Sequence, residues 1–443
     1  MRRAIYRAWA ALRARPLLRR MQELERSQWL SRDEIEALQI GRLRDTLTHA
    51  AREVPYYADL FRQAGLDPAA VKSVADLRSL PALSRETLAA SYDRLRCRDG
   101  ARAGVIERST GGSSGRPVRF LVDEKEMTER SAHIYRNLRW LGWDLGDRMA
   151  YVWGSDIDSS EHSGWRGGLR DAVAGVLWLD AFRLEEATLD HQLDRLERFD
   201  PAVVIGYPSS LHLLARRALA TGRRGPLRGI ETSAEMLAPE VRRELEQVFG
   251  CAVLDRYGCR EAGVIAHECP AGGRHVNAEA VVMEMEQGEV LVTTLNNRVM
   301  PLIRYRLEDA AEPAPGACPC GRGLPLVGAL RGRVSDIIRS PSGRLIHGEF
   351  FTHLFYGAQG VSAFQVEQTA RNTLEIRYVA DGRFDARSRD VITTAIRSHG
   401  DAAFSVGWVP VKSIDPGPSG KFRFTIGWSP SDRPDSRNSP PFQ

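Results

Sequence analysis

The stretch Arg108-Ser-Thr-Gly-Gly-Ser-Ser-Gly-Arg-Pro117 packs hydroxyl side chains among glycines and ends on a proline. Glycines let backbone N–H groups point into one concavity, and hydroxyls add donors, so such a loop can hold phosphate oxygens. It is not a Walker loop, because no Lys-Ser or Lys-Thr pair follows its last glycine. A flexible turn is the plain alternative. The candidate phosphate ligands are Ser109, Thr110, Gly111, Gly112, Ser113, Ser114 and Gly115.

Around this loop, short apolar runs alternate with helical repeats. Strands are expected at 118–121, 150–154, 203–205 and 252–254, and helices at 35–62 with a break at Pro55, 124–140, 186–199, 209–219 and 239–249. This alternation favours an α/β fold with a largely parallel sheet.

The pattern changes after Glu279. Strands expected at 281–286, 289–294 and 300–305 indicate a β-rich subdomain, whereas a hairpin near 337–346, strands at 374–379 and 406–411 and a helix at 388–398 indicate a small α+β domain. We therefore predict an N-terminal domain over residues 1–335, a small mobile C-terminal domain over 336–428 and a disordered tail over 429–443, which is rich in Pro, Ser, Asp and Arg.

The amino-acid composition and net charge limit the classes of function that fit this chain. The 443 residues are 43% hydrophobic and 27% charged, which is typical of a soluble globular protein. The net charge of +5 is small for this length, so we expect no nucleic-acid partner. The sequence shows no secretory signal and no apolar run long enough to span a bilayer, so we expect a cytoplasmic protein.

The segment Met1–Arg20 is locally basic, with seven arginines and no acid. A basic amphipathic helix can lie on an anionic membrane surface. The alternative is a solvated helix that packs on the domain through its apolar side.

Four further polar stretches follow the loop in order. They are Ser233-Ala-Glu235 before a helix, Arg256-Tyr-Gly-Cys-Arg-Glu261 after a strand, Arg304-Tyr-Arg-Leu-Glu-Asp309 with Gly332-Arg-Val-Ser-Asp336, and Gly417-Pro-Ser-Gly-Lys421. Taken singly, each charged residue is equally well explained as a surface carboxylate, a turn cap, a local ion pair or a solvated lysine. Their order and spacing together favour one site.

With these stretches the chain resembles the adenylate-forming enzymes, and within them the phenylacetate–coenzyme A ligase branch and its CapK-like relatives in capsular polysaccharide biosynthesis. The resemblance covers nearly the whole chain and includes Val54-Pro-Tyr-Tyr57, Ile205-Gly-Tyr-Pro-Ser-Ser210, Glu231-Thr-Ser-Ala-Glu-Met-Leu237 and Cys318-Pro-Cys-Gly-Arg-Gly-Leu-Pro325. It implies ATP-dependent activation of a carboxylic acid as an acyl-adenylate, followed by transfer to a thiol, most simply coenzyme A.

The resemblance also implies residue roles. The glycine–serine loop would hold phosphates, and Glu261 would bind a Mg²⁺ ion. Asp309 would bind the ribose, Arg333 the ribose or a phosphate, and Lys421 the substrate carboxylate and the α-phosphate. The adenine would be flanked by Ser233, Ala234, Glu235, Tyr257 and Gly258. Asp336 would be the hinge about which the small domain rotates between half-reactions. Two departures stand out: Cys259-Arg260 replaces a segment rich in small hydroxyls, and Glu308 replaces a glycine.

Cysteine and histidine spacing suggests a metal. Cys269, His275, Cys318 and Cys320 can form a tetrahedral structural zinc set, which the resemblance supports. The alternative is a buried thiol at Cys269 plus a Cys-Pro-Cys turn, with His267 and Cys259 as substitute ligands.

Three rivals to the coenzyme A ligase remain at this stage. The first is transfer of the acyl group to an amine or carrier in polysaccharide or secondary-metabolite assembly. The second is a non-catalytic scaffold of the same fold, and the third is a membrane-associated partner of an assembly complex. Relatives are often homodimers. Trp153, Tyr207 and His133 are weaker candidates for an aryl or acyl slot, and core packing is the favoured alternative for all three.

Overall fold

The computed structural model describes residues 14–99, 104–109, 118–154, 171, 173–181, 186–223, 227–314, 316–331, 338–346, 348–355, 358, 360–414 and 425–428. The chain divides into two compact units. The first holds residues 1–110, 118–181 and 186–333, and the second holds 111–117, 182–185 and 334–443. The predicted boundary at 335/336 lies outside the described residues and stays a prediction, as does the disordered tail.

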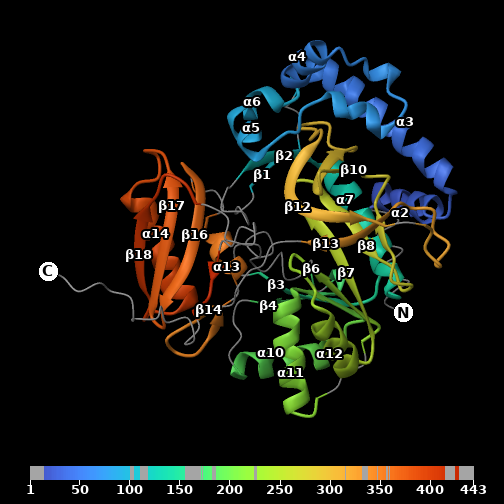
Figure 1. Ribbon diagram of the computed structural model, residues 1–443. Helices are drawn as coiled ribbons and strands as arrows, with labels where there is room; N and C mark the ends of the chain where they lie inside the picture. Colours follow the sequence, from blue (N-terminus) through green and yellow to red (C-terminus); the bar gives the residue numbers. More distant parts are fainter. Residues whose placement is uncertain are drawn as a thin grey trace. The chain divides into compact units, whose positions relative to one another are not determined.

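An 11-stranded mixed sheet forms the first unit (Figure 1). One half is parallel, in the order β7-β6-β5-β3-β4. Its strands are β3 (Met149–Trp153), β4 (Val176–Asp180), β5 (Val203–Gly206), β6 (Gly229–Ser233) and β7 (Ala252–Cys259). The predicted α/β class is confirmed, but the largely parallel sheet is confirmed only for these five strands, because the sheet as a whole is mixed. β4 and β6 were not expected from the sequence.

The other half of the sheet is antiparallel, in the order β10-β11-β12-β13-β9-β8. Its strands are β8 (Gly263–Glu268), β9 (Arg274–Val276), β10 (Val281–Glu286), β11 (Glu289–Thr294), β12 (Tyr305–Pro313) and β13 (Leu326–Arg331). The strand predicted at 300–305 is wrong. Residues 300–304 form an irregular connection, because Pro301 offers no N–H to a ladder and Arg304 adopts a φ of +54°.

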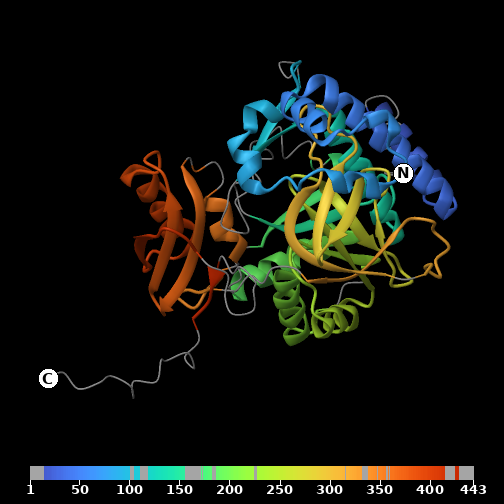
Figure 2. The same cartoon turned by 45° about the horizontal axis from the view of Figure 1, so that its top comes forward.

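Helices pack on both halves. The N-terminal elements are α2 (Arg15–Ser27), α3 (Arg32–Glu53), α4 (Pro55–Ala64), η1 (Pro68–Ala70), η2 (Val74–Ser79), α5 (Arg85–Ala90) and α6 (Tyr92–Leu95). Helices α7 (Glu124–Trp140), α10 (Glu186–Phe199), α11 (Pro208–Ala220) and α12 (Pro239–Phe249) complete the unit, with a hairpin of β1 (Val105–Ser109) and β2 (Arg119–Asp123). Figure 2 shows α3 and α4 beside the yellow strands, which they meet in a common apolar core.

The second unit contains a four-stranded sheet in the order β18-β17-β16-β19. Its elements are β14 (Ile338–Arg339), β15 (Leu345–Ile346), α13 (Gly348–Leu354), β16 (Val361–Ala370), β17 (Thr373–Ala380), α14 (Ala386–Ala395), η3 (Ile396–Gly400), β18 (Ser405–Pro410) and β19 (Thr425–Ile426). Stacked Phe355 and Phe364 rings, 3.8 Å apart, lie in its core. The predicted α+β character is confirmed. In neither unit does a described helix meet the length and hydrophobicity needed to span a bilayer.

Candidate active site

Two residues expected around adenosine contact each other. Tyr257 on β7 donates a hydrogen bond from Oη to Asp309 Oδ2 on β12, at 3.0 Å. In the sheet, β7 and β12 are separated by β13, β9 and β8. The contact between their side chains therefore requires the sheet to be strongly curved. Gly258 follows Tyr257 at a register shift, and a Cβ there would lie 2.3 Å from the carbonyl oxygen of Gly263. The tight β7–β8 hairpin therefore requires glycine at this position.

The Glu261 side chain is held by groups from two other elements. It is 1% exposed, accepts a hydrogen bond from Tyr305 Oη at 2.8 Å, and lies 3.3 Å from Arg85 Nη2 at the start of α5. Burial, followed by the negative charge of Glu261, raises the pKa of Tyr305 well above its usual value, so the phenol stays protonated and donates. Arg85 was not identified from the sequence, because a lone arginine after a turn matches no motif.

Arg130 of α7 fixes the backbone that carries Glu261. Its two Nη atoms donate to the carbonyl oxygens of Arg260 at 2.6 Å and Glu261 at 2.7 Å. Arg260 in turn donates to the carbonyl of Ser109 at 3.2 Å, where the glycine–serine stretch begins. The acidic site and the first residue of the proposed phosphate loop are thus neighbours.

The turn 233–235 joins β6 to α12. Ala234 is exposed and adopts a φ of +70°, a left-handed conformation that costs a non-glycine residue about 1–2 kcal/mol. Glu235 accepts a hydrogen bond from the backbone N–H of Ser209 at 3.0 Å, which anchors the turn to the first turn of α11. Strain that is held in place in this way is common at ligand sites.

The remaining predicted nucleotide residues lie outside the described residues. They are Thr110, Gly111, Gly112, Ser113, Ser114, Gly115, Arg333, Asp336 and Lys421. Their roles stay predictions.

The predicted metal ligands form one cluster. One ligand atom from each of Cys269, His275, Cys318 and Cys320 lies within 4.8 Å of the others. The Cys269 and Cys318 sulfurs are 3.5 Å apart, and Cys320 Sγ is 3.2 Å from His275 Nε2. Tetrahedral zinc with Zn–S bonds of about 2.3 Å places ligand atoms about 3.8 Å apart, so the donor set fits.

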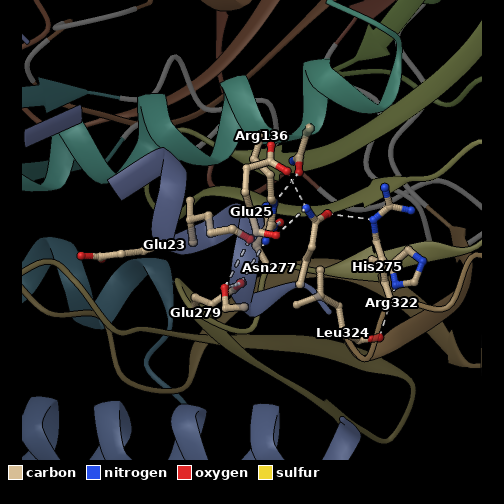
Figure 3. A network of polar contacts seen from close by, with 12 residues as sticks. Glu23, Glu25, Arg136, His275, Asn277, Glu279, Arg322 and Leu324 are labelled. Atoms are coloured by element: carbon tan, nitrogen blue, oxygen red, sulfur yellow. Dashed lines mark hydrogen bonds and ion pairs between the residues drawn. The ribbon is translucent and has the colours of Figure 1, made fainter. Parts of the chain in front are cut away.

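The chain around the cluster orients these donors. His275 Nδ1 donates to the carbonyl of Leu324 at 3.3 Å, which leaves Nε2 for a metal (Figure 3). Gly273 lies so close to Cys318 that a Cβ would be 2.6 Å from its sulfur. His267, the substitute ligand considered from the sequence, pairs instead with Glu231 at 2.7 Å.

A buried polar network lies beside the cluster. Arg136 of α7 bonds to Asn277 and, at 2.9 Å, to Glu279 (Figure 3). Ser27 of α2 also donates to Glu279, at 2.6 Å. The network therefore ties α2 and α7 to the segment that follows β9. The same helix α2 buries Arg20 against Glu129 at 2.6 Å, so the described part of the basic N-terminal segment packs on the protein.

Comparison with known proteins identifies relatives of this chain. Phenylacetate–coenzyme A ligase of Escherichia coli (strain K12) is 27% identical over 338 residues, which cover 71% of this chain and 75% of that protein. Protein CapK of Staphylococcus aureus is 23% identical over 286 residues, which cover 62% of each chain. The model of the CapK C-terminal domain matches residues 338–427. The chain is a relative of the phenylacetate–coenzyme A ligases and of CapK.

The fold of this CapK relative is that of adenylate-forming enzymes. A 2-hydroxyisobutyryl-CoA ligase solved with 2-HIB-AMP and CoA in the thioesterification state has a TM-score of 0.60 at 17% identity, covering 91% of this chain and 92% of that one. An open conformation of the same ligase has a TM-score of 0.58 at 19% identity, covering 91% and 93%.

Proposed function

We propose that the chain is an ATP-dependent acid–thiol ligase that forms an acyl-adenylate. In the first step a carboxylate oxygen attacks the α-phosphorus of ATP, and the bond to pyrophosphate breaks. In the second, the thiol sulfur of coenzyme A attacks the acyl carbon and AMP leaves. The observation that carries the proposal is the convergence of Tyr257, Asp309, Glu261 and Ser109 in a relative of phenylacetate–coenzyme A ligases.

The first step brings two anions together, so the site must supply positive charge and fixed donors. Lys421 and Arg85 would supply the charge, the latter from beside Glu261. Glu261 would hold Mg²⁺, since hard cations take carboxylate oxygens. Asp309 would accept hydrogen bonds from the ribose hydroxyls. The ion would neutralise phosphate charge, whereas the side chains orient the reactants.

The Cys269/His275/Cys318/Cys320 cluster would hold zinc in a structural role. Four protein ligands complete a tetrahedron and leave no open position for substrate. This set of donors supports zinc because three are sulfurs and the fourth is an oriented imidazole nitrogen.

A screen of aryl, fatty and amino acids in ATP–pyrophosphate exchange, with and without coenzyme A, tests the function. We expect exchange with a subset of acids, and thioester formation when coenzyme A is added. Absence of exchange with every acid would leave the scaffold of the same fold as the better explanation.

The CapK match favours a second candidate, transfer of the acyl group to an amine or a carrier in polysaccharide assembly. It predicts exchange without a thioester from free coenzyme A. The same screen separates the two. Under either candidate we propose a cytoplasmic enzyme, with peripheral membrane contact through Met1–Arg20 and dimerisation as further points to be measured by liposome pelleting and light scattering.

A further inference from the structure

Four side chains lie at one level across four neighbouring parallel strands. Val152, Gly206, Thr232 and Asp255 are register partners in turn, so the residues that follow them also align. These are Trp153, Tyr207, Ser233 and Arg256, and Ser233 and Arg256 are themselves partners. Side chains at one level of a parallel sheet share a face. The row lies at or just past the carboxyl ends of β3, β5 and β6 and at the last parallel pair of β7, which is the edge where α/β sheets bind ligands. Arg256 directly precedes Tyr257.

The row combines an aromatic wall with a cation. The rings of Trp153 and Tyr207 stack 4.4 Å apart at 27°. The Arg256 guanidinium carbon lies 5.9 Å from the Trp153 ring. Arg256 Nε donates to Ser233 Oγ at 3.2 Å, and Nη1 lies 2.8 Å from Glu231 Oε1. The aromatic pair can pack against a flat apolar group of a ligand, and the guanidinium can donate a hydrogen bond to an acceptor on that ligand.

Two buried side chains lie behind Arg256 and form a trio with it. Glu231 Oε1 is 2.8 Å from Arg256 Nη1, and Glu231 Oε2 is 2.7 Å from His267 Nε2. His267 Nδ1 is in turn 2.6 Å from the carbonyl oxygen of Glu268. Because Glu231 and His267 are fully buried, these contacts fix the direction of the Arg256 side chain.

Arg256 is the member of the trio that reaches the edge. Its side chain is 11% exposed, whereas those of Glu231 and His267 are 0% exposed. Within the described part of the chain, Arg256 Nε donates a hydrogen bond to Ser233 and Nη1 forms an ion pair with Glu231, and neither contact uses Nη2. A guanidinium held at two nitrogens keeps a fixed direction for a third contact.

We propose that Arg256 selects acids that carry a second hydrogen-bond acceptor on a flat ring, remote from the carboxylate to be activated. The inference rests on the proposed function and adds the substrate class to it. The Trp153–Tyr207 pair would hold the ring, and the Arg256 guanidinium would donate to the acceptor.

Pyrophosphate exchange with 4-methyl-, 4-hydroxy- and 4-carboxyphenylacetate tests the proposal, because the three acids differ mainly in the remote group. For the wild-type chain we expect kcat/KM to be at least about tenfold higher for the two acceptor-bearing acids than for the methyl compound. Arg256→Met should reduce this ratio by about 10- to 100-fold, and Arg256→Lys should restore part of it.

Arg256→Met leaves Glu231 without a cation, so a double variant with Glu231→Gln serves if the single variant does not fold. Arg148→Met is the matched control, since Arg148 lies beyond the other end of β3 and bonds to the carbonyl of Phe199. In this control variant, the ratio of kcat/KM between the acceptor-bearing acids and the methyl compound should stay unchanged. A wild-type preference for the methyl acid, or a ratio that survives Arg256→Met, would overturn the inference while leaving the ligase activity established. No exchange with any acid would refute the proposed function itself.

Discussion

At the scale of single residues, Glu261 combines nearly complete burial with a paired charge. Because water is almost excluded, its carboxylate acts on its surroundings with little screening. We expect Glu261→Gln to lower the rate of pyrophosphate exchange by about 10²- to 10³-fold, through loss of the proposed Mg²⁺ ligand. Glu289→Gln is the control, because Glu289 is 49% exposed and forms an ion pair with Arg306 across β11 and β12. Equal activity of the two variants would exclude a role for Glu261 in catalysis.

Tyr257 also permits a residue-scale test. Tyr257→Phe removes the hydrogen bond to Asp309 but keeps the ring. A single hydrogen bond contributes about 0.5–1.5 kcal/mol, so KM for ATP should rise by roughly 2- to 12-fold with kcat little changed. Tyr56→Phe, on α4, is the control. Steady-state kinetics with varied ATP decide the matter, and an unchanged KM would show that this contact does not position the nucleotide.

At the scale of elements, the loop that carries Cys318 and Cys320 meets the end of α2. Gly323 N–H donates to the carbonyl of Gln28, and a Cβ on Gly323 would lie 1.9 Å from the carbonyl oxygen of Leu30. We therefore expect Gly323→Ala to destabilise the protein by about 1–3 kcal/mol or more, with a lower melting temperature. Gly41→Ala on α3 meets no atom within 4 Å and should be neutral or stabilising. Equal melting curves would contradict the packing described.

The Cys/His cluster gives a second test at this scale. We expect one zinc per chain in the purified protein, measured by elemental analysis. Cys318→Ser should abolish it and lower the melting temperature, because a structural metal contributes folding free energy. Cys251→Ser, outside the cluster, should retain the metal. Full metal content in the Cys318 variant would reject this ligand set.

At the scale of the whole molecule, the lysine proposed for adenylation and most of the nucleotide residues belong to different compact units. If the units act in alternate arrangements, Lys421→Ala should lower pyrophosphate exchange by orders of magnitude but spare thioester formation from a synthetic acyl-adenylate. Lys412→Ala, an exposed lysine of the same unit, should affect neither. Loss of both half-reactions in the Lys421 variant would point to misfolding or a different role.

Local patterns predicted much of this fold. The helices at 124–140, 186–199 and 239–249 and the strands at 281–286 and 289–294 have the predicted bounds, because periodicity and flanking prolines or glycines determine them locally. β4, β6 and β13 were among the strands that were missed, since pairing with neighbouring strands stabilises a strand whose own sequence pattern is weak. The strand predicted at 300–305 failed because backbone geometry at Pro301 and Arg304 outweighed the apolar pattern.

By itself the sequence determined the fold class and the residue types of the site, since periodicity and motif order are properties of the chain. Only the tertiary structure decided which of those residues meet: Arg85 with Glu261, His267 with Glu231 in place of a metal, and Trp153 and Tyr207 in line with Arg256. These contacts depend on strand register and sheet curvature, which bring together segments that are 36 to 176 residues apart. No local sequence pattern encodes a separation of that kind, because it results from packing the whole core at once.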